Sequence, residues 1–390
     1  MTAGCGTSAG VWTKVVRLSS VLFATLPFLS FAGRTAGFSM SAFNTVVSAS
    51  SASAVFSPLS FELDCALISE AFGPVEKAAY VEALGALVGY DSVYRPILEN
   101  YAESATNGFS LVSARAFLVP SLRFVTPRYR SFVQSEYRAQ VCPVRPAADG
   151  AESFLRAAMD GEMEDFSVPG DVLVSRGASF CDLESFRCSW AEPFPRDNTC
   201  RRDFTAANGD RRPVEMMSDV RSADVWTTER FSMLRLPMTG GAWFFAVLPA
   251  EGVPLAAVRG DFAAEKFDDA MVVFRAAADP SVYHGMVSVG LPKFAVDTVV
   301  DLKPAFLSFS LPIGGFKEIF PGQEAVLCSV GQRTRFVLDE RGPGGTEAVA
   351  VPCGGGSARK FVCDRPFLFF VYHEPTRTVP VAGIFAGGAS

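Results

Sequence analysis

The sequence is short of histidine: it has only His284 and His373 in 390 residues. Histidine is a frequent general base and the most common metal ligand, so a histidine-dependent triad or zinc centre has almost no material here. The nine cysteines also contain no closely spaced CxxC pair of the zinc-knuckle kind. We therefore expect no metal, no cofactor and no catalytic residue, and we predict that the chain is not an enzyme.

Charged residues are also scarce, at 19% of the chain, and the formal net charge is -6. A surface that follows a phosphate backbone needs clustered cations, and the sequence has no run of lysine and arginine. We expect neither nucleic acid nor, in the mature chain, a membrane as partner, and we expect a monomer. The 49% of hydrophobic residues are enough to form a large buried core.

The N-terminal residues resemble an export signal. Lys14 and Arg17 precede the apolar stretch "LSSVLFATLPFLS", and the small residues Ser30 and Ala32 stand before a possible cleavage site ahead of Gly33. This pattern predicts a signal peptide over 1–32 and a secreted protein. The alternative is a cytoplasmic protein whose apolar stretch forms a buried helix, and the absence of any Asn-x-Ser/Thr sequon weakens the case for export. Loss of Cys5 with the signal would leave eight cysteines, which permits disulfides.

The organisation of the chain indicates an α+β fold. Apolar residues recur at helical spacing from Phe38 to Gly89, whereas short strand-like runs separated by Gly/Pro turns dominate from Val214 onward. The runs "ARAFLVP", "FSMLRLP", "AWFFAVLP", "VSVGLPKFAV" and "FLFFVYHE" each predict a strand. No change in composition marks a linker, so we expect a single domain over 33–390.

Four motifs occur in a fixed order. They are "VFSPLS" (55–60), "FRCSWAEPF" (186–194), "LPKF" with "DLKPAF" (291–306), and "FVCDRPFLFFVYHEPTRTVPVAGIF" (361–385). In this order and spacing they resemble the serpin family from Phe38 to Phe385, and the texture is most similar to viral serpins. The resemblance implies a large central sheet A, two smaller sheets B and C, about eight or nine helices, and an exposed reactive-centre loop over 340–361.

The resemblance also implies a function. In serpins a target serine or cysteine protease cleaves the reactive-centre loop, and the part before the cut inserts into the central sheet, distorting the protease before it can deacylate. The small residues of "GGTEAVAV" suit a segment that must enter a sheet interior. The residues that match the family's hinge are Glu340, Gly344, Gly345, Thr346, Glu347 and Ala348. An ordinary flexible glycine-rich loop is the alternative interpretation.

The position of the cleaved bond is left open by the spacing. Counting back from Phe361 places it near Cys353 and Gly354, and counting forward from Thr346 places it near Arg359 and Lys360. Taking "LDERG" as the start of the hinge gives Gly356 and Ser357 instead. Arg359 is the candidate that a trypsin-like pocket would select, because that pocket carries an acidic floor.

Pro352 departs from what an inserting loop needs. A central strand uses every backbone N–H, and proline has none, so we expect insertion to stall near Val351. The two counts above also make the loop several residues shorter than the family's spacing. A short loop that contains Pro352 favours an alternative function, a non-inhibitory serpin-fold protein that acts by binding or immunomodulation.

The resemblance further implies a polar cluster under the sheet and a contact at its top. Ser57 and Ser60 match the family's cluster, while Asp182 stands where the family has asparagine and Gln332 where it has histidine. At the top of the sheet the matching residues are Trp190, Lys293 and Glu340, and the last two are expected to form a salt bridge.

Overall fold

The computed structural model describes residues 38–47, 52–84, 90–144, 148–159, 161–167, 177–262, 264–276, 279–320, 326–344 and 358–387. Residues 38–47 are helical. The further α-helices are α2 (Pro58–Ser69), α3 (Pro74–Ala83), α4 (Tyr90–Ser104), α5 (Pro127–Tyr137), α6 (Ala148–Ala158), α8 (Leu255–Gly260), α9 (Ala264–Arg275) and α10 (Lys303–Ser308). Short 3-10 helices cover Ala105–Asn107, Leu122–Phe124, Arg196–Asn198 and Thr239–Gly241.

Fourteen strands complete the described secondary structure. They are β1 (Ala54–Phe56), β2 (Phe109–Val119), β3 (Gln140–Pro143), β4 (Ala178–Cys188), β5 (Cys200–Thr205), β6 (Arg211–Thr227), β7 (Phe231–Pro237), β8 (Ala242–Pro249), β9 (Val282–Pro292), β10 (Phe294–Asp301), β11 (Leu327–Leu338), β12 (Arg359–Val362), β13 (Phe367–His373) and β14 (Thr378–Phe385). The predicted α+β class is confirmed, and each of the five predicted strand runs lies in or across these strands.

One sheet has five strands in the order β10-β11-β4-β2-β3. At its centre β11 and β4 are direct neighbours and run parallel, with Gln332 opposite Asp182. We call this boundary between β4 and β11 the seam. The ladder along it is regular from Ser329 onward, with a shift of register between Leu327 and Ser329.

The second sheet has nine strands, in the order β1-β14-β13-β8-β7-β6-β9-β12, with β5 paired to β6. Two separate smaller sheets were expected, and they are joined here. The reason is the length of β6, whose 17 residues pair with β5 at one end, β7 at the other, and β9 without interruption from Met216 to Trp226. A strand that long continues the hydrogen bonding through both halves.

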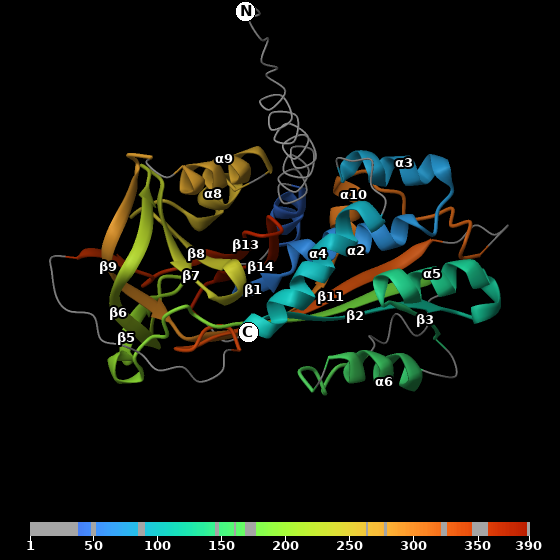
Figure 1. The fold of residues 1–390 in the computed structure, drawn as a ribbon, viewed down its shortest axis with the longest axis horizontal. Coiled ribbons are helices and arrows are strands. Elements are labelled where there is room, and N and C mark those ends of the chain that lie inside the picture. The colour runs from blue at the N-terminus through green and yellow to red at the C-terminus, as the bar shows by residue number, and fades with distance from the viewer. Residues whose placement is uncertain are drawn as a thin grey trace, which may run out of the picture.

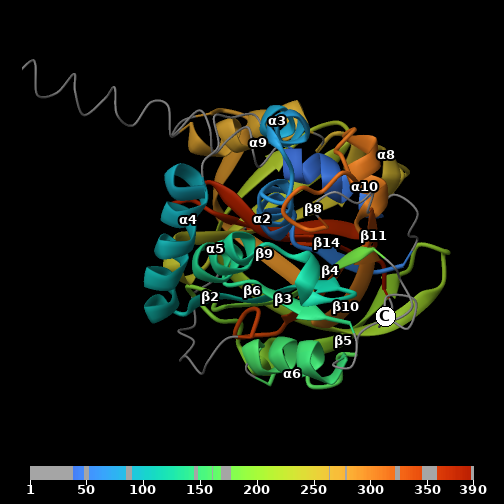
Figure 2. The same ribbon diagram turned by 90° about the vertical axis from the view of Figure 1, so that its right-hand side faces the viewer.

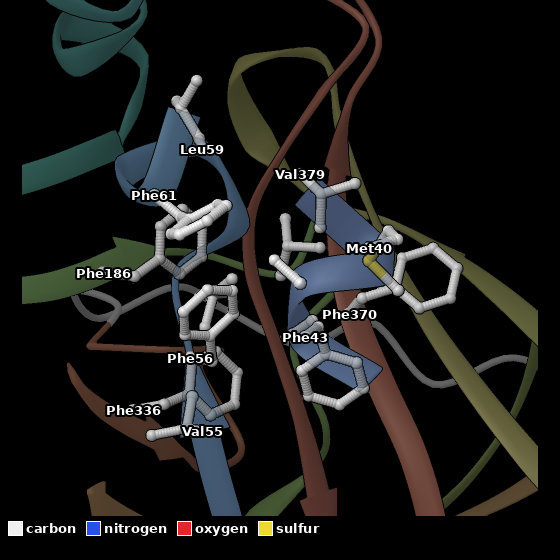
Figure 3. Packing of buried hydrophobic residues seen from close by; sticks show 14 of the residues in the cluster. Met40, Phe43, Val55, Phe56, Leu59, Phe61, Phe186, Phe336, Phe370 and Val379 are labelled. Carbon is white, nitrogen blue, oxygen red and sulfur yellow. The ribbon is translucent and has the colours of Figure 1, made fainter. Parts of the chain in front are cut away.

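The helices cover the sheets unequally (Figures 1 and 2). α6 lies on one face of the five-stranded sheet, while α2, α4 and α5 lie on the other, and α8 and α9 cover the nine-stranded sheet. The main core forms between the two sheets. Figure 3 shows it drawing on both sheets and the first helices, through Met40, Phe43, Val55, Phe56, Leu59, Phe61, Phe186, Phe336, Phe370 and Val379.

The start of α2 shows how the sequence shapes this core. Ser57 is the N-cap, its hydroxyl oxygen accepts a hydrogen bond from the backbone N–H of Ser60 over 3.3 Å, and Pro58 occupies the first turn, where a missing N–H costs nothing. All 12 residues of α2 are buried, because the helix passes between the two sheets. Polar side chains on this helix therefore need partners inside the protein.

Two further findings concern the described residues alone. The seven cysteines among them, Cys65, Cys142, Cys181, Cys188, Cys200, Cys328 and Cys363, are all free thiols, so the disulfides that the count permitted do not form there. None of the helices in the described part of the chain is both long and apolar enough to cross a membrane. The predicted signal peptide over 1–32 lies outside the described residues.

Candidate functional site

Four of the predicted polar residues meet beneath the seam. Gln332 on β11 donates from Nε2 to Asp182 Oδ2 on β4 over 3.1 Å, and its Oε1 accepts from the backbone N–H of Ser57 over 2.8 Å. The hydroxyl of Ser57 in turn donates to the carbonyl oxygen of Pro380 over 2.7 Å. Gln332 therefore connects the two strands of the seam to the start of α2.

Ser60 leads to a second group that the sequence analysis missed. Its hydroxyl donates to Glu184 on β4 and accepts from Nη2 of Arg115 on β2 over 2.6 Å. Arg115 also contacts Glu184 Oε1 at 2.7 Å and donates from Nε to Asp64 Oδ1 on α2 at 3.0 Å. Asp182 Oδ1 lies 3.6 Å from the same Nε. Arg115, Asp64 and Glu184 thus extend the predicted cluster.

A signal for Glu184 existed in the sequence. Side chains two residues apart on a strand share a face, so Glu184 had to lie beside Asp182 and between the buried Phe180 and Phe186. Arg115 could be suspected because it interrupts the apolar run "ARAFLVP". Asp64 carried no comparable signal, since an acid within a helix usually lies on an exposed face.

Burial dominates the electrostatics of this group. It raises the pKa of Asp64 well above its ordinary value, the charge of Asp182 raises it further, and Arg115 opposes the shift. The pKa of Glu184 is raised for the same reasons in the same order. Desolvation acts to lower the pKa of the Arg115 guanidinium, but the surrounding carboxyls outweigh it and the net shift is upward.

The opposite face of the seam is crossed by the segment that follows α6. Glu162 forms an ion pair with Arg187 and accepts from the hydroxyl of Ser185 over 3.3 Å, both on β4, while its backbone carbonyl accepts from Arg335 on β11 over 2.9 Å. One residue thus contacts both strands of the seam, and we call residues 161–165 the clasp. Within the clasp, Asp165 also forms an ion pair with Arg333 of β11 at 3.0 Å.

The top of the seam contains the expected ion pair. Lys293 Nζ lies 3.1 Å from Glu340 Oε2, and the hydroxyl of Thr199 donates to Glu340 Oε1 over 2.8 Å. Partial burial acts to raise the pKa of Glu340, but hydrogen bonds from the backbone, Thr199 and Lys293 prevail, and the net pKa lies below its ordinary value. Trp190, buried beside them, donates from Nε1 to the carbonyl oxygen of Asp339 over 3.0 Å.

The first residues of the predicted reactive-centre loop are bonded to β4 and to the residues after it. The N–H of Trp190 donates to the carbonyl oxygen of Arg341 over 2.9 Å, and the N–H of Cys188 to that of Pro343 over 2.5 Å. Between them Gly342 has a φ of 110°, and a Cβ at this position would lie 2.6 Å from the carbonyl oxygen of Cys188. Glycine is therefore required there for the backbones to approach.

The far end of the loop lies in the nine-stranded sheet. Arg359 and Lys360 are the first residues of β12, opposite Val287 and Ser288 of β9. The guanidinium of Arg359 donates to the hydroxyl of Thr227 over 2.7 Å. The other predicted loop residues lie outside the described residues, namely Gly345, Thr346, Glu347, Ala348, Pro352, Cys353, Gly354, Gly356 and Ser357.

Comparison with known proteins decides the family. The sequence model of the serpin (serine protease inhibitor) family matches residues 34–386. The chain belongs to the serpin family. Serpin B6 of Macaca fascicularis is 24% identical over 314 residues, which cover 75% of this chain and 81% of that protein. Glia-derived nexin of Homo sapiens is 28% identical over 217 residues, 51% of this chain and 52% of that one.

Solved structures confirm the serpin fold. Native protease nexin-1 with heparin superposes with a TM-score of 0.77 at 18% identity, covering 93% of this chain and 99% of that one. AtSerpin1 of Arabidopsis in its native stressed conformation gives 0.77 at 16% identity, with 92% and 98% covered. Human thyroxine-binding globulin in complex with its hormone gives 0.73 at 17% identity, with 93% and 100% covered. At these identities the likeness shows the fold alone.

Proposed function

We propose that this serpin is a protease inhibitor of the suicide-substrate type, in which a serine or cysteine protease cleaves the reactive-centre loop and the part before the cut inserts into the seam. The observation that carries the proposal is the state of the seam. β4 and β11 are paired directly, yet the loop's first residues already take the N–H groups of Cys188 and Trp190. The place of entry is therefore prepared while the sheet is closed.

The two contacts also give a direction and a register. One bond joins Trp190, just beyond β4, to Arg341, and the next joins Cys188, the last residue of β4, to Pro343. The residue number thus falls by two on the side of β4 while it rises by two on the loop, which is the pattern of an antiparallel ladder. Continued along β4, this register would place residue 349 opposite Asp182 and residue 353 opposite Ala178, the first residue of β4. The loop as far as Cys353 is then long enough to span β4.

The same geometry supports a position for the cut. A protease binds its substrate as an extended segment whose backbone groups are free to pair with the enzyme. Arg359 and Lys360 already use theirs in β12, so cleavage after Arg359 would first require β12 to leave the sheet. This supports the bonds before β12, at Cys353–Gly354 or Gly356–Ser357, over the trypsin-like site at Arg359.

The second candidate function is a non-inhibitory serpin that acts by binding. Pro352 favours it, because a strand with no N–H at that position completes its ladder less well. The fold admits this role, since thyroxine-binding globulin, as its name says, binds thyroxine. Export after cleavage near Ala32, a monomeric state and a viral-like origin stay predictions, as does the single domain over 33–390.

Incubation with a panel of serine and cysteine proteases tests the proposal. An inhibitor gives a complex that survives denaturing electrophoresis, and mass spectrometry of the released C-terminal fragment gives the bond. Complete cleavage by every protease without complex would favour the binding role instead. Cleavage mapped to Arg359–Lys360 would contradict our placement of the cut while leaving the mechanism standing.

A further inference from the structure

One arginine and three acidic side chains are buried together under the seam. Arg115 is 5% exposed, and Asp64, Asp182 and Glu184 are each 0% exposed. With all four ionised, one positive and three negative charges would give the group a net charge of -2. A net charge without solvent costs several kcal/mol, so the group must be neutralised from elsewhere or by protons.

The side chains that face the group from α2, α4 and β11 add no further positive charge. α2 adds Glu62 and Cys65, and α4 adds Tyr101, none of which is a cation. Burial raises the pKa of Cys65 and of Tyr101, so both stay neutral. β11 turns the neutral Gln332 and Thr334 towards the group, together with Ser57 and Ser60 from the start of α2.

The arginines of β11 lie on the other face of the sheet. Arg333 binds Asp165 and Asp297, and Arg335 binds the carbonyl oxygen of Glu162. Residues next to each other on a strand point to opposite faces, so neither arginine reaches the group around Arg115. The neutralising charge must therefore come from protons.

The unsatisfied oxygens show where protons fit. Asp64 Oδ2, Asp182 Oδ1 and Glu184 Oε2 are buried and have no donor in the structure. Asp182 is within hydrogen-bonding reach of both Asp64 and Glu184. An ionised carboxyl only accepts, so neighbouring carboxylates cannot satisfy one another, whereas a protonated carboxyl donates one O–H.

We propose that Asp64 and Glu184 each carry a proton and that each O–H donates a hydrogen bond to Asp182 Oδ1. The closed seam then rests on a neutral cluster of Arg115, one carboxylate and two carboxylic acids. The two added hydrogen bonds supply a partner to each unsatisfied oxygen. They also leave the observed contacts of Arg115 in place, because these use the other oxygens of Asp64 and Glu184.

The cluster bears on the seam through Asp182. The Asp182 carboxylate also accepts a hydrogen bond from Gln332 across the boundary between β4 and β11. If Asp64 and Glu184 lose their protons, they no longer hold Asp182 in place, and this cross-strand contact is weakened. The upward pKa shifts of Asp64 and Glu184 give the sign. A group that binds its proton more tightly in the closed form stabilises that form at low pH, and the effect declines as pH rises above the ordinary carboxyl range towards the raised pKa.

We infer that parting of β4 and β11 becomes easier as pH rises. That this parting admits the reactive-centre loop rests on the proposed function, but the cluster and its protons do not. The test variant combines Asp64→Asn with Glu184→Gln. Its amide groups can donate hydrogen bonds to Asp182 in place of the acids, and they do so at any pH because they do not titrate. The control is Glu82→Gln with Asp203→Asn, which removes two exposed acids elsewhere.

The test is amide hydrogen exchange of β4 and β11 at about pH 7 and about pH 9, corrected for intrinsic rates. For the wild type and the control we expect the opening equilibrium to rise with pH, by up to about tenfold per pH unit for each proton released. For Asp64→Asn with Glu184→Gln we expect no such rise, and protection at about pH 9 at least equal to that of the wild type. Equal pH dependence in all three proteins would overturn the proposal.

A second measurement covers the case in which the double variant does not fold. Infrared spectroscopy of the wild type at about pH 7 should show the carbonyl stretch of buried carboxylic acids, and either single variant, Asp64→Asn or Glu184→Gln, should reduce it. A wild-type spectrum without that band would refute the proposal. No protease enters either experiment, so absence of inhibition would count against the proposed function and leave the cluster standing.

Discussion

The backbone N–H of Cys188, the last residue of β4, donates to the carbonyl oxygen of Pro343, four residues before the predicted hinge residue Glu347. With the bond from Trp190 to Arg341 it fixes an antiparallel register. Continued along β4, this register would bring Glu347 opposite Glu184. Residues directly opposite in such a ladder share a face, so the carboxyl of Glu347 would enter the buried cluster around Arg115.

Glu347→Ala is therefore expected to convert more encounters into trapped complex. Bringing a further carboxylate beside Glu184 costs several kcal/mol unless it takes up a proton, and this slows insertion while the protease deacylates. We expect the ratio of trapped to merely cleaved serpin to rise about tenfold or more, which corresponds to about 1.4 kcal/mol in the insertion barrier. Denaturing gels at fixed protease concentration measure this ratio.

The control for this variant is Thr346→Ala. Its side chain would point to the opposite face in the same register, so it should leave the ratio nearly unchanged. Equal gains from both variants would contradict the register. Lowering the pH towards the carboxyl range should raise this ratio for the wild type relative to that for Glu347→Ala, because only the wild type has this carboxyl to protonate and the pH effect of the buried cluster is common to both proteins.

Pro352→Ala is expected to give a smaller gain. In the register above, residue 352 would direct its backbone groups towards β11 near Leu327 and Ser329, where the ladder already has a shift of register. The missing N–H then leaves one acceptor unpaired at the irregular end of the seam, a loss of about 1 kcal/mol. We expect the trapped fraction to rise by about fivefold at most. A gain larger than that of Glu347→Ala would show that the ladder is regular at this end.

The seam shows how much of the fold and of the site the sequence could predict. The order of motifs predicted the fold, and Lys293 with Glu340, or Ser57 with Gln332, could be paired from the resemblance. The partners of Arg115 could not be predicted in this way, because Arg115 on β2 meets Asp64 on α2 and Glu184 on β4, and these three elements are far apart in the chain. The joined sheets were equally hidden, since nothing local in a strand says whether its pairing continues past a bend.

The clasp predicts a third variant. Glu162→Gln removes the charge that pairs with Arg187, a half-exposed contact, so we expect a loss of about 1 kcal/mol or less in closure of the seam. Amides of β4 and β11 should exchange faster, by about fivefold at most. Glu164→Gln, two residues on and exposed, is the control. Faster exchange confined to residues 161–165 would mean that the clasp covers the seam without holding it.

The last prediction concerns His373, which is buried at the end of β13. Its Nε2–H donates to the carbonyl oxygen of Gly240 over 3.1 Å, and Nδ1 accepts from the hydroxyl of Thr376 over 2.8 Å. The ring stacks on Phe109, with centroids 4.4 Å apart. Burial lowers the pKa of His373 to about 4, against a smaller opposing effect of the bond to Gly240.

The sign of the pH effect follows from that depressed pKa. Between the ordinary value of about 6.5 and the folded value of about 4, the unfolded chain holds the proton and the folded protein does not. Unfolding therefore takes up a proton, and the stability that neutral His373 contributes is present above about pH 6.5 and is lost as pH falls towards 4. From about pH 7 to about pH 5 this amounts to about 2 kcal/mol.

His373→Gln keeps a donor for Gly240 and does not titrate. We expect the variant to be less stable than the wild type at about pH 7, because it loses the stacking on Phe109, and to lose less stability on acidification. The raised carboxyls Asp64 and Glu184 act in the opposite direction in both proteins, so the difference between the two proteins isolates the histidine. Urea midpoints at the two pH values measure it. Parallel shifts would show that His373 is not the group responsible.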